Sequence, residues 1–354
     1  MKFIHTADLH LGAGGKSKLP PEKARIRRRE LLDTFRHIAE LAEREGAAVL
    51  IAGDLFDSPT PSAATLSDVL TTVRRHAGVR FLCLPGNHDG ERFPTEDVPE
   101  NLTLFGDTWQ CVTVGDTDVY GIAPHGDIPY GELTTDPARK NIVLLHGGLK
   151  EGGSPEAGAV LLSALAGRGI DYLALGHYHS YSEGRLDARG VYAYAGTPEG
   201  RGMDEAGDCG VLLIDTDTLP VAPRFRKIAM RTVHRLSVAL PEGGDPLLTE
   251  QAIARAVSGI DGGDLVRIEL VGRRSPDLPA PDCARLTALL CDRFFHFEVK
   301  DTTRLDIRPE DYVGSLTLKG MLVDLLAASE PDDAMRDEIL TAALAALRGE
   351  EDEI

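Results

Sequence analysis

Short apolar segments of this chain end repeatedly in clusters of aspartate, asparagine and histidine. Five such motifs follow one another: Asp8-Leu9-His10, Gly53-Asp54-Leu55-Phe56-Asp57, Gly86-Asn87-His88-Asp89, Leu145-His146-Gly147-Gly148 and Gly176-His177-Tyr178-His179. A short apolar run that ends in a polar turn is typical of a buried strand. Because side chains at the carboxyl ends of neighbouring strands converge on one crevice, the pattern predicts a shared polar site on an α/β fold.

The residue types within these motifs predict a metal centre. Residues i and i+2 of an extended segment point to the same side, so Asp8 with His10, and His177 with His179, can each aim two ligands into one cleft. Imidazole, carboxylate and amide ligands without thiolate suit Mn²⁺, Fe²⁺ or Zn²⁺ better than Ca²⁺. Two such ions about 3.5–4 Å apart are a standard device for hydrolysing phosphate esters. Any one motif alone would more often be structural, but five in this order predict a two-metal site.

The first part of the chain alternates strand and helix patterns. Apolar runs at residues 2–6, 47–52 and 79–84 predict strands, and helical spacing at 30–45 and 62–75 predicts two helices between them. The other elements expected here are strands at 102–105, 110–114, 118–122, 142–145, 172–175, 191–194 and 210–214 and a helix at 156–166. Two sheets packed face to face with helices outside, a four-layer α-β-β-α sandwich, account for this order.

The second part of the chain has a different organisation. Two prolines interrupt the pattern within residues 220–227 and predict a boundary there. Residues 233–300 show a β-α-β-α-β pattern without any metal motif, and 315–328 and 334–347 have helical spacing with one apolar face. We therefore expect three parts: residues 1–225, an α+β domain at 230–308, and C-terminal helices at 312–354.

Length, charge and cysteine content restrict the class of protein. A chain of 354 residues exceeds the usual size of a single core, and a net charge of −18 argues against holding nucleic acid by the overall field alone. Met1 lies so close to Asp8 that no cleavable signal peptide fits before it, and the longest apolar stretches are too short to span a bilayer. Five cysteines form no Cys-x-x-Cys pair. We expect a cytoplasmic protein without a membrane segment.

One stretch is basic against this acidic background. It contains three lysines and four arginines: Lys16, Lys18, Lys23, Arg25, Arg27, Arg28 and Arg29. One interpretation is the solvated start of a helix. The other is a contact with a phosphate backbone beside the metal site. The sequence leaves both interpretations open.

The motif order Asp-x-His, Gly-Asp-x-x-Asp, Gly-Asn-His-Asp, His and Gly-His-x-His resembles that of calcineurin-like metallophosphoesterases, over residues 1–215. Residues 3–12 and the segment Ala-Tyr-Ala-Gly-Thr-Pro-Glu-Gly-Arg at 193–201 resemble DNA-repair exonucleases of the SbcD type. The resemblance implies a metallophosphoesterase sandwich with a smaller α+β capping domain. It also implies C-terminal helices that dock on an SMC-like ATPase of the SbcC type.

The same resemblance implies a ligand set for two divalent metal ions, with Mn²⁺ favoured and Fe²⁺ or Zn²⁺ as alternatives. The expected ligands are Asp8, His10 and His179 for the first metal, Asn87, His146 and His177 for the second, and Asp54 as the bridge between them.

Four further residues receive roles from the resemblance. His88 is expected beside the scissile phosphate as the catalytic residue, with Asp89 orienting its ring. Asp57 and Arg201, the last residue of the segment at 193–201, are expected to contact the substrate. Asp57 departs from the pattern, because some nucleases of this type carry a histidine there that positions the phosphate.

The resemblance thus predicts a Mn²⁺-dependent DNA exonuclease or endonuclease that acts in DNA repair with an SMC-like ATPase partner and forms a homodimer. Two alternatives stay open. The chain could be a phosphodiesterase or phosphatase for small nucleotides from the same superfamily. It could also be a non-catalytic binding module, although the complete ligand set argues against that.

Overall fold

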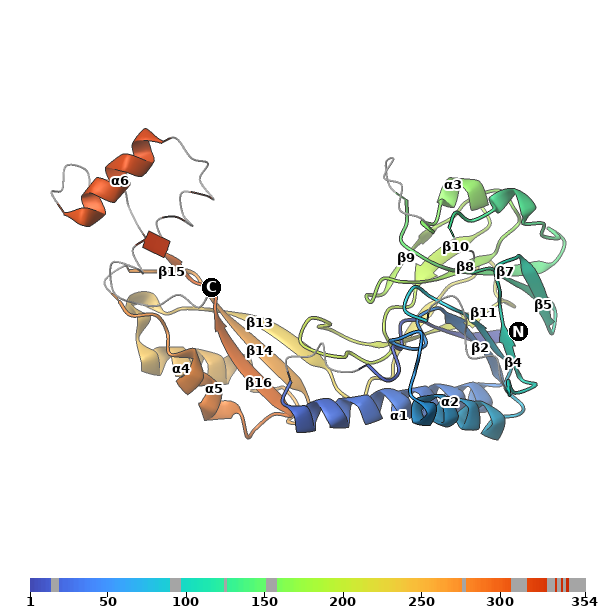
Figure 1. Cartoon of the computed structure of the whole chain (residues 1–354), viewed down its shortest axis with the longest axis horizontal. Helices are drawn as coiled ribbons and strands as arrows, with labels where there is room; N and C mark the ends of the chain where they lie inside the picture. The colour runs from blue at the N-terminus through green and yellow to red at the C-terminus, as the bar shows by residue number, and fades with distance from the viewer. Residues whose placement is uncertain are drawn as a thin grey trace. The chain divides into compact units, whose positions relative to one another are not determined.

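Figure 1 shows the computed structural model of the chain. The structure describes residues 1–13, 19–89, 97–123, 126–150, 158–275, 278–306, 317–329, 335, 339, 342 and 343. The chain divides into two compact units, residues 1–233 and 234–354. Among the described residues, no helix combines the length and the apolar character needed to cross a membrane.

The first unit contains two six-stranded sheets, and the first sheet has the order β12-β11-β1-β2-β3-β4. Its strands are β1 (Lys2–Thr6), β2 (Ala47–Ala52), β3 (Phe81–Leu84), β4 (Leu102–Leu104), β11 (Gly210–Asp215) and β12 (Arg224–Lys227). Strands β1 to β4 run parallel, and their register brings the carboxyl ends of β1, β2 and β3 to one edge. Residues 220–227, where we expected a domain boundary, therefore contribute an antiparallel strand to this sheet.

The second sheet has the order β5-β6-β7-β8-β10-β9. Its strands are β5 (Gln110–Val114), β6 (Thr117–Gly121), β7 (Lys140–His146), β8 (Tyr172–Gly176), β9 (Ser182–Arg185) and β10 (Val191–Tyr194). The central four strands run parallel, while β5 and β9 are antiparallel edges. Because His146 pairs with Gly176, the carboxyl ends of β7 and β8 lie side by side.

The two sheets form the inner layers of a sandwich. Helices α1 (Pro21–Glu45) and α2 (Ala63–Arg75) cover the outer face of the first sheet, and an apolar layer that includes Leu50 and Leu144 fills the space between the sheets. The outer face of the second sheet is covered by η1 (Tyr130–Glu132), α3 (Leu162–Leu165) and adjoining loops. The predicted four-layer α/β architecture is confirmed, with a thin fourth layer.

The helix predicted at residues 156–166 was wrong in extent. Its described part is helical only at Leu162–Leu165, and Val160 instead forms a bridge with Leu149. Apolar residues of this segment are buried by tertiary packing rather than by one face of a long helix.

Helix α1 begins well before its predicted start at residue 30. Pro21 occupies its first turn, where a missing backbone N–H costs nothing. The N-terminal half buries Arg27 and Glu30, which contact each other, so it shows no apolar period. Because Arg27 is buried, it is neither part of a solvated helix start nor able to contact a phosphate backbone. Arg25 and Arg29 are exposed.

The second unit is built on the three-stranded sheet β13-β14-β16. The strands are β13 (Val233–Ala239), β14 (Leu265–Val271) and β16 (His296–Asp301); the other elements are η2 (Glu242–Gly244), α4 (Pro246–Ala256), β15 (Arg273–Arg274), α5 (Cys283–Leu290), β17 (Arg304–Leu305) and α6 (Leu318–Ala328). Helices α4 and α5 pack on one face of the sheet, which follows the expected β-α-β-α-β order. The second predicted C-terminal helix, 334–347, lies almost wholly outside the described residues.

Candidate metal centre

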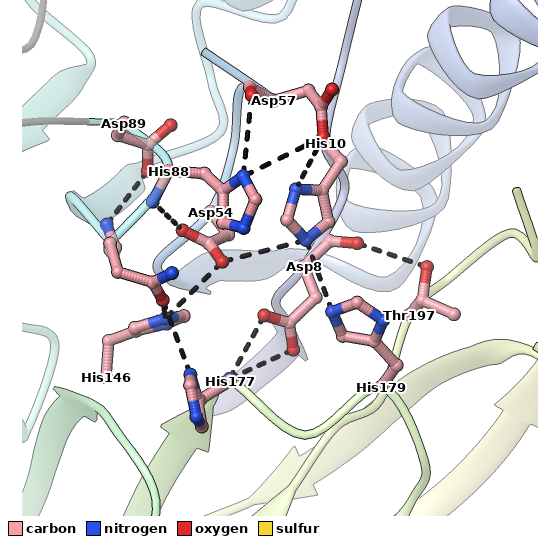
Figure 2. A network of polar contacts seen from close by, with 12 residues as sticks. Asp8, His10, Asp54, Asp57, His88, Asp89, His146, His177, His179 and Thr197 are labelled. Carbon is pink, nitrogen blue, oxygen red and sulfur yellow. Dashed lines mark hydrogen bonds and ion pairs between the residues drawn. The ribbon is translucent and has the colours of Figure 1, made fainter. Parts of the chain in front are cut away.

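The seven predicted metal ligands come from the carboxyl ends of strands in both sheets of the first unit. Asp8 and His10 follow β1, Asp54 follows β2, Asn87 follows β3, His146 ends β7, and His177 and His179 follow β8. Figure 2 shows the labelled members of this set pointing toward one another. The structure thus brings together all seven residues at the edge that the sequence predicted.

Four of these residues have a backbone conformation that side chains rarely adopt. The φ angles are +54° at Asp8, +45° at His10, +52° at Asp54 and +115° at His177. Such left-handed conformations are uncommon outside glycine and cluster at functional sites, where the surrounding structure holds them. Here the amides of Asp8 and His10 donate to the carbonyls of Gly53 and Asp54, which fixes the two ligand turns against each other.

Two glycines allow the ligand loops to approach one another. Gly53 has a φ of +90°, and a Cβ there would lie 2.2 Å from Nδ1 of His146. A Cβ on Gly86 would lie 2.2 Å from a carboxylate oxygen of Asp54. Only a residue without a side chain fits at either place, so both glycines of the motifs serve the close packing of ligands.

The first ligand group consists of Asp8, His10 and His179, whose donor atoms all lie within 4.8 Å of one another. Nε2 of His10 is 3.3 Å from Nε2 of His179, and the Asp8 carboxylate accepts the amide of His177 at 3.0 and 3.1 Å. Burial raises the pKa of Asp8 well above its usual range. Burial, assisted by the charge of Arg201, lowers the pKa of His10 to about 2. His10 is therefore neutral and retains a lone pair for a cation.

Asp54 lies between the two ligand groups. Its Oδ2 is 3.6 Å from Nε2 of His10 and 3.5 Å from Nε2 of His146, while its Oδ1 accepts the amide of His88 at 2.8 Å. The side chain is almost completely buried. A carboxylate that faces one imidazole from each group has the position that a bridging ligand requires.

The second ligand group centres on the amide oxygen of Asn87. This Oδ1 is 2.9 Å from Nε2 of His146 and 3.3 Å from Nδ1 of His177. Nδ1 of His146 lies 2.9 Å from the carbonyl of Ala52, a contact that places a proton on Nδ1 and leaves Nε2 bare. Burial lowers the pKa of His146, which also favours the neutral ring.

The donor set fits divalent cations. Asp8 and Asp54 are buried carboxylates that face imidazoles, and isolated buried charges of this kind are costly. Nδ1 of His10 is also buried without a hydrogen-bond partner among the described residues, although Asp57 Oδ1 lies 3.3 Å away. Cations held by these oxygens and nitrogens would neutralise the carboxylates, and the absence of thiolates from the set excludes a sulfur-dominated site.

His88 stands at the rim of the ligand cluster. Its ring centroid is 4.6 Å from that of His10, edge to face, and the side chain is partly exposed. Nδ1 of His88 lies 3.4 Å from the backbone carbonyl of Asp57. When Nδ1 donates a hydrogen bond to this carbonyl, Nε2 stays available to a bound molecule.

Asp89 does not have the environment that we expected from the sequence. Its carboxylate accepts three backbone amides, from Leu55 at 3.1 Å, Phe56 at 2.6 Å and Gly86 at 2.9 Å. These donors, rather than the ring of His88, satisfy the buried carboxylate. Burial nevertheless raises the pKa of Asp89 to about 6. Asp89 therefore ties the loop after β2 to the loop after β3.

Residues 1–181 match the family described as calcineurin-like phosphoesterase, and this match extends over half of the chain. The chain belongs to that family. The ligand-bearing motifs all fall within the matched residues, and the predicted superfamily is confirmed.

This phosphoesterase is also similar to archaeal proteins named DNA double-strand break repair protein Mre11. The relative from Sulfolobus acidocaldarius is 28% identical over 218 residues, which are 56% of this chain and 55% of that protein. The relative from Aeropyrum pernix is 26% identical over 275 residues (69% and 64%), and that from Haloferax volcanii is 28% identical over 289 residues (79% and 63%). The chain spans little more than half the length of the Sulfolobus relative. These matches confirm the predicted resemblance to DNA-repair members of the family.

The two predicted substrate contacts of this phosphoesterase lie together. Nη1 of Arg201 is 3.3 Å from Oδ1 of Asp57, and Nη2 of Arg201 is 3.1 Å from Nδ1 of His179. Asp57 in turn approaches the rings of His10 and His88, at 3.3 and 3.9 Å. A guanidinium and a carboxylate therefore border the first ligand group on the same side as His88.

Two polar residues of this phosphoesterase escaped the sequence analysis. Oε1 of Glu205 is 2.8 Å from Nδ1 of His179, and Thr197 donates its hydroxyl to the carbonyl of Asp8 at 3.1 Å. Burial alone would raise the pKa of Glu205, but hydrogen bonds from His179 and Arg201 hold it at about 2. Thr197 belongs to the segment at 193–201 whose resemblance the sequence showed, but its role was not assigned there, and Glu205 stands in no recognisable motif.

Proposed function

We propose that this chain is a Mn²⁺-dependent DNA exonuclease or endonuclease of the SbcD type that hydrolyses phosphodiesters with two metal ions. The observation that carries the proposal is the position of Asp54, whose Oδ2 faces His10 at 3.6 Å and His146 at 3.5 Å. The printed name of the relatives, which refers to DNA double-strand break repair, supports DNA as the substrate. Ligation by imidazole, carboxylate and amide supports manganese among the divalent metals.

The chain's own residues define what a bound phosphodiester would meet. Asp8, His10 and His179 would hold one cation, Asn87, His146 and His177 the other, and Asp54 both. When bound, such a pair supplies Lewis-acid activation of a water nucleophile and neutralises charge on the phosphoryl oxygens. The strained turns at Asp8 and Asp54 keep their carboxylates in place before any cation arrives.

His88 assists the departure of the leaving group in this mechanism. Its ring lies against the first ligand group, is open to solvent on one side, and has its Nδ1 near the Asp57 carbonyl. Nε2 is then free to hold a proton for the leaving 3′ oxygen or to stabilise the charge that develops there. General-acid catalysis of this kind contributes about 10²–10⁴ in rate.

Arg201 and Asp57 contact the phosphate of the substrate in this proposal. Arg201 brings a fixed positive charge to the rim of the site, and its Nη1 contact with Asp57 holds it there at 3.3 Å. A guanidinium can donate two parallel hydrogen bonds to a pair of phosphate oxygens. Since the chain has a net charge of −18, cations held by these residues would supply the attraction for DNA that the overall field lacks.

We also propose an SMC-like ATPase of the SbcC type as partner and a homodimer as the working form, in the cytoplasm. Helix α6 supports the partner, because its Leu318, Met321 and Leu325 are each more than 60% exposed. Deleting residues 310–354 should abolish association with the ATPase and leave hydrolysis of a small diester intact. Loss of both would indicate a folding role and contradict the docking proposal.

The test of the proposed function is a cleavage assay. The purified chain is incubated with Mn²⁺ and end-labelled linear duplex DNA, with a small chromogenic phosphodiester as a second substrate. His88→Ala should reduce DNA cleavage by about 10²–10⁴ with unchanged metal content. His37→Ala serves as the matched control, because His37 is an exposed histidine on α1.

Each outcome of this assay has a separate meaning. DNA shortening that His88→Ala abolishes and His37→Ala preserves supports the nuclease. Cleavage of the small diester alone, repeated in the presence of an SbcC-type ATPase, would favour the alternative of a small-nucleotide phosphodiesterase. No hydrolysis of either substrate with Mn²⁺, Fe²⁺ or Zn²⁺ would overturn the proposal.

A further inference from the structure

One nitrogen of the metal-ligand cluster has two neighbours with opposite hydrogen-bonding properties. Nδ1 of His179 lies 2.8 Å from Oε1 of Glu205 and 3.1 Å from Nη2 of Arg201. A carboxylate can only accept a hydrogen bond, whereas a guanidinium can only donate one. A neutral imidazole carries a single proton, so Nδ1 can satisfy Glu205 or Arg201 but not both. The Nδ1–H tautomer pairs with Glu205, and the tautomer with a bare Nδ1 pairs with Arg201.

This choice determines what the other ring nitrogen of His179 can do. Nε2 of His179 faces Nε2 of His10 at 3.3 Å and groups with the donor atoms of Asp8 and His10. When Nδ1 carries the proton, Nε2 has a free lone pair and can ligate a cation. When Arg201 donates to Nδ1, the proton sits on Nε2 and blocks ligation. A hydrogen bond at the outer nitrogen of a ligating histidine commonly selects the tautomer in this way.

We infer that Glu205 is a positioning residue that holds His179 in the tautomer able to bind the first metal, against a competing donor from Arg201. The inference rests on the two-metal part of the proposed function. Glu205 acts through His179 and touches neither substrate nor metal in this assignment.

Arg201 has a double role in the inference. Its backbone amide and its Nε and Nη2 atoms donate to Glu205 at 2.6, 2.9 and 2.6 Å, so Arg201 clamps the carboxylate beside the ring. The same guanidinium would donate a hydrogen bond to Nδ1 of His179 if the Glu205 carboxylate were missing. Arg201 is therefore helpful while Glu205 is present and harmful once Glu205 is removed.

The segment that carries both residues is anchored from outside the site. Arg27 of α1 donates to the carbonyl of Gly200 and to the carboxylate of Glu199, directly before Arg201. Because all of these groups are buried, the start of this segment is fixed relative to α1. The segment that carries Glu205 is therefore fixed in place beside His179, as a positioning role requires.

The test is a double-mutant cycle on Mn²⁺ affinity, measured by calorimetry without DNA. Glu205→Ala should weaken one of the two bound ions by about 10–100-fold, the range found when the partner of a ligating histidine is removed. Glu205→Gln should lose less, because its amide oxygen can still accept the Nδ1 proton. Adding Arg201→Ala to Glu205→Ala should restore part of the affinity, and by more than Arg201→Ala changes the affinity of the wild type.

A matched control addresses the change in charge. Asp208→Ala also removes one carboxylate close to Glu205 in sequence, but Asp208 is exposed and pairs with Lys227 at 2.6 Å. Its Mn²⁺ affinity should equal that of the wild type. If it fell as far as that of Glu205→Ala, the loss would be one of net charge and the inference would fail.

A spectroscopic measurement reports the tautomer directly. In ¹⁵N spectra of the metal-free protein, the His179 signals, assigned by their loss in His179→Ala, should show Nδ1–H in the wild type and Nε2–H in Glu205→Ala. Additive effects in the cycle, or the same tautomer in both proteins, would overturn the inference. A wild type that binds no Mn²⁺ would instead remove the proposed function itself, so the two failures are distinguishable.

Discussion

Two clusters of buried charged side chains in the first unit compensate their charges in different ways. The metal-ligand cluster consists of the seven ligands Asp8, His10, Asp54, Asn87, His146, His177 and His179. The Arg27 network consists of Arg27, Glu30, Glu199 and Arg231 with the hydroxyl of Thr34. The segment 199–205 links the two clusters. It begins with Glu199 in the network and ends with Glu205, whose carboxylate contacts His179.

In the Arg27 network every carboxylate meets a guanidinium. Arg27 contacts both Glu30 and Glu199, and Arg231 donates to Glu30 at 2.8 Å. Glu199 is fully buried and also accepts the hydroxyl of Thr34 at 3.1 Å. Burial alone would raise the pKa of Glu30, but hydrogen bonds from Arg231 and Arg27 bring it below its ordinary value. The charges of this network are compensated within the chain.

In the metal-ligand cluster the carboxylates meet imidazoles instead. Asp54 faces His10 and His146, and burial raises the pKa of Asp8 well above its usual range. Arg201, at the rim, is already committed to Glu205 and Asp57. Buried acids that the chain itself compensates are structural, whereas buried acids left facing lone pairs require cations from outside. This difference makes the two clusters respond in opposite ways to the same perturbations.

The largest expected effect is on the Arg27 network. Glu199→Gln keeps the shape of the side chain but leaves the buried Arg27 without one of its charge partners. Removing one member of a buried ion pair costs about 3–5 kcal/mol. Denaturant unfolding in the presence of a chelator measures the loss. Trp109, the single tryptophan, packs in the first unit and reports its unfolding by fluorescence.

An exposed ion pair on the same helix supplies the control for Glu199→Gln. Asp33 and Arg36 pair at 2.6 Å with both side chains about one-third exposed. Asp33→Asn should change the free energy of unfolding by no more than about 1 kcal/mol. Equal losses in Glu199→Gln and Asp33→Asn would show that the Arg27 network contributes no more than a surface pair.

The second effect separates the clusters by adding metal. Mn²⁺ that binds only the folded chain should stabilise the first unit by about 2.7 kcal/mol for each site when its free concentration is 100 times the dissociation constant. Asp54→Asn should remove this gain, since Asp54 lies between both ligand groups. Glu199→Gln should keep it. Thermal unfolding of the three proteins with and without Mn²⁺ measures this stabilisation. Equal stabilisation of Asp54→Asn and the wild type by Mn²⁺ would contradict a bridging role for Asp54.

The two clusters also differ in how far the sequence predicted them. The ligand cluster was predictable because its residues stand in short local motifs at strand ends, and the period of a strand places residues such as Asp8 and His10 on one side. Parallel pairing of β1, β2 and β3 then brings separate motifs to one edge. The fold followed from the same alternation of apolar strands and amphipathic helices.

The Arg27 network was not predictable because the contacts that close it, from Glu199 and Arg231, join single residues far apart in the chain. Arg27 and Glu199 are separated by 172 positions, and neither stands in a pattern that marks it as buried. The early start of α1 was missed for the same reason, since ion pairs replace apolar residues on its buried face. The contacts of Asp89 and Glu205 at the site were unpredictable for the same reason. The three backbone amides that donate to Asp89, and the His179 ring that contacts Glu205, come close to these carboxylates only in the folded chain.

The smallest expected effect is also the most direct comparison, because it repeats the carboxylate-to-amide change in the other cluster. Asp8→Asn removes a buried negative charge that faces imidazoles, while the new amide oxygen can still accept the backbone N–H of His177. In the presence of a chelator this variant should be more stable than the wild type by about 0.5–2 kcal/mol, as is common when a strained functional site is relieved. With Mn²⁺ the order should reverse, since the wild type gains the stabilisation of a bound ion that Asp8→Asn cannot hold. A loss of stability in chelator, as in Glu199→Gln, would mean that Asp8 is compensated within the chain and that the two clusters do not differ in kind.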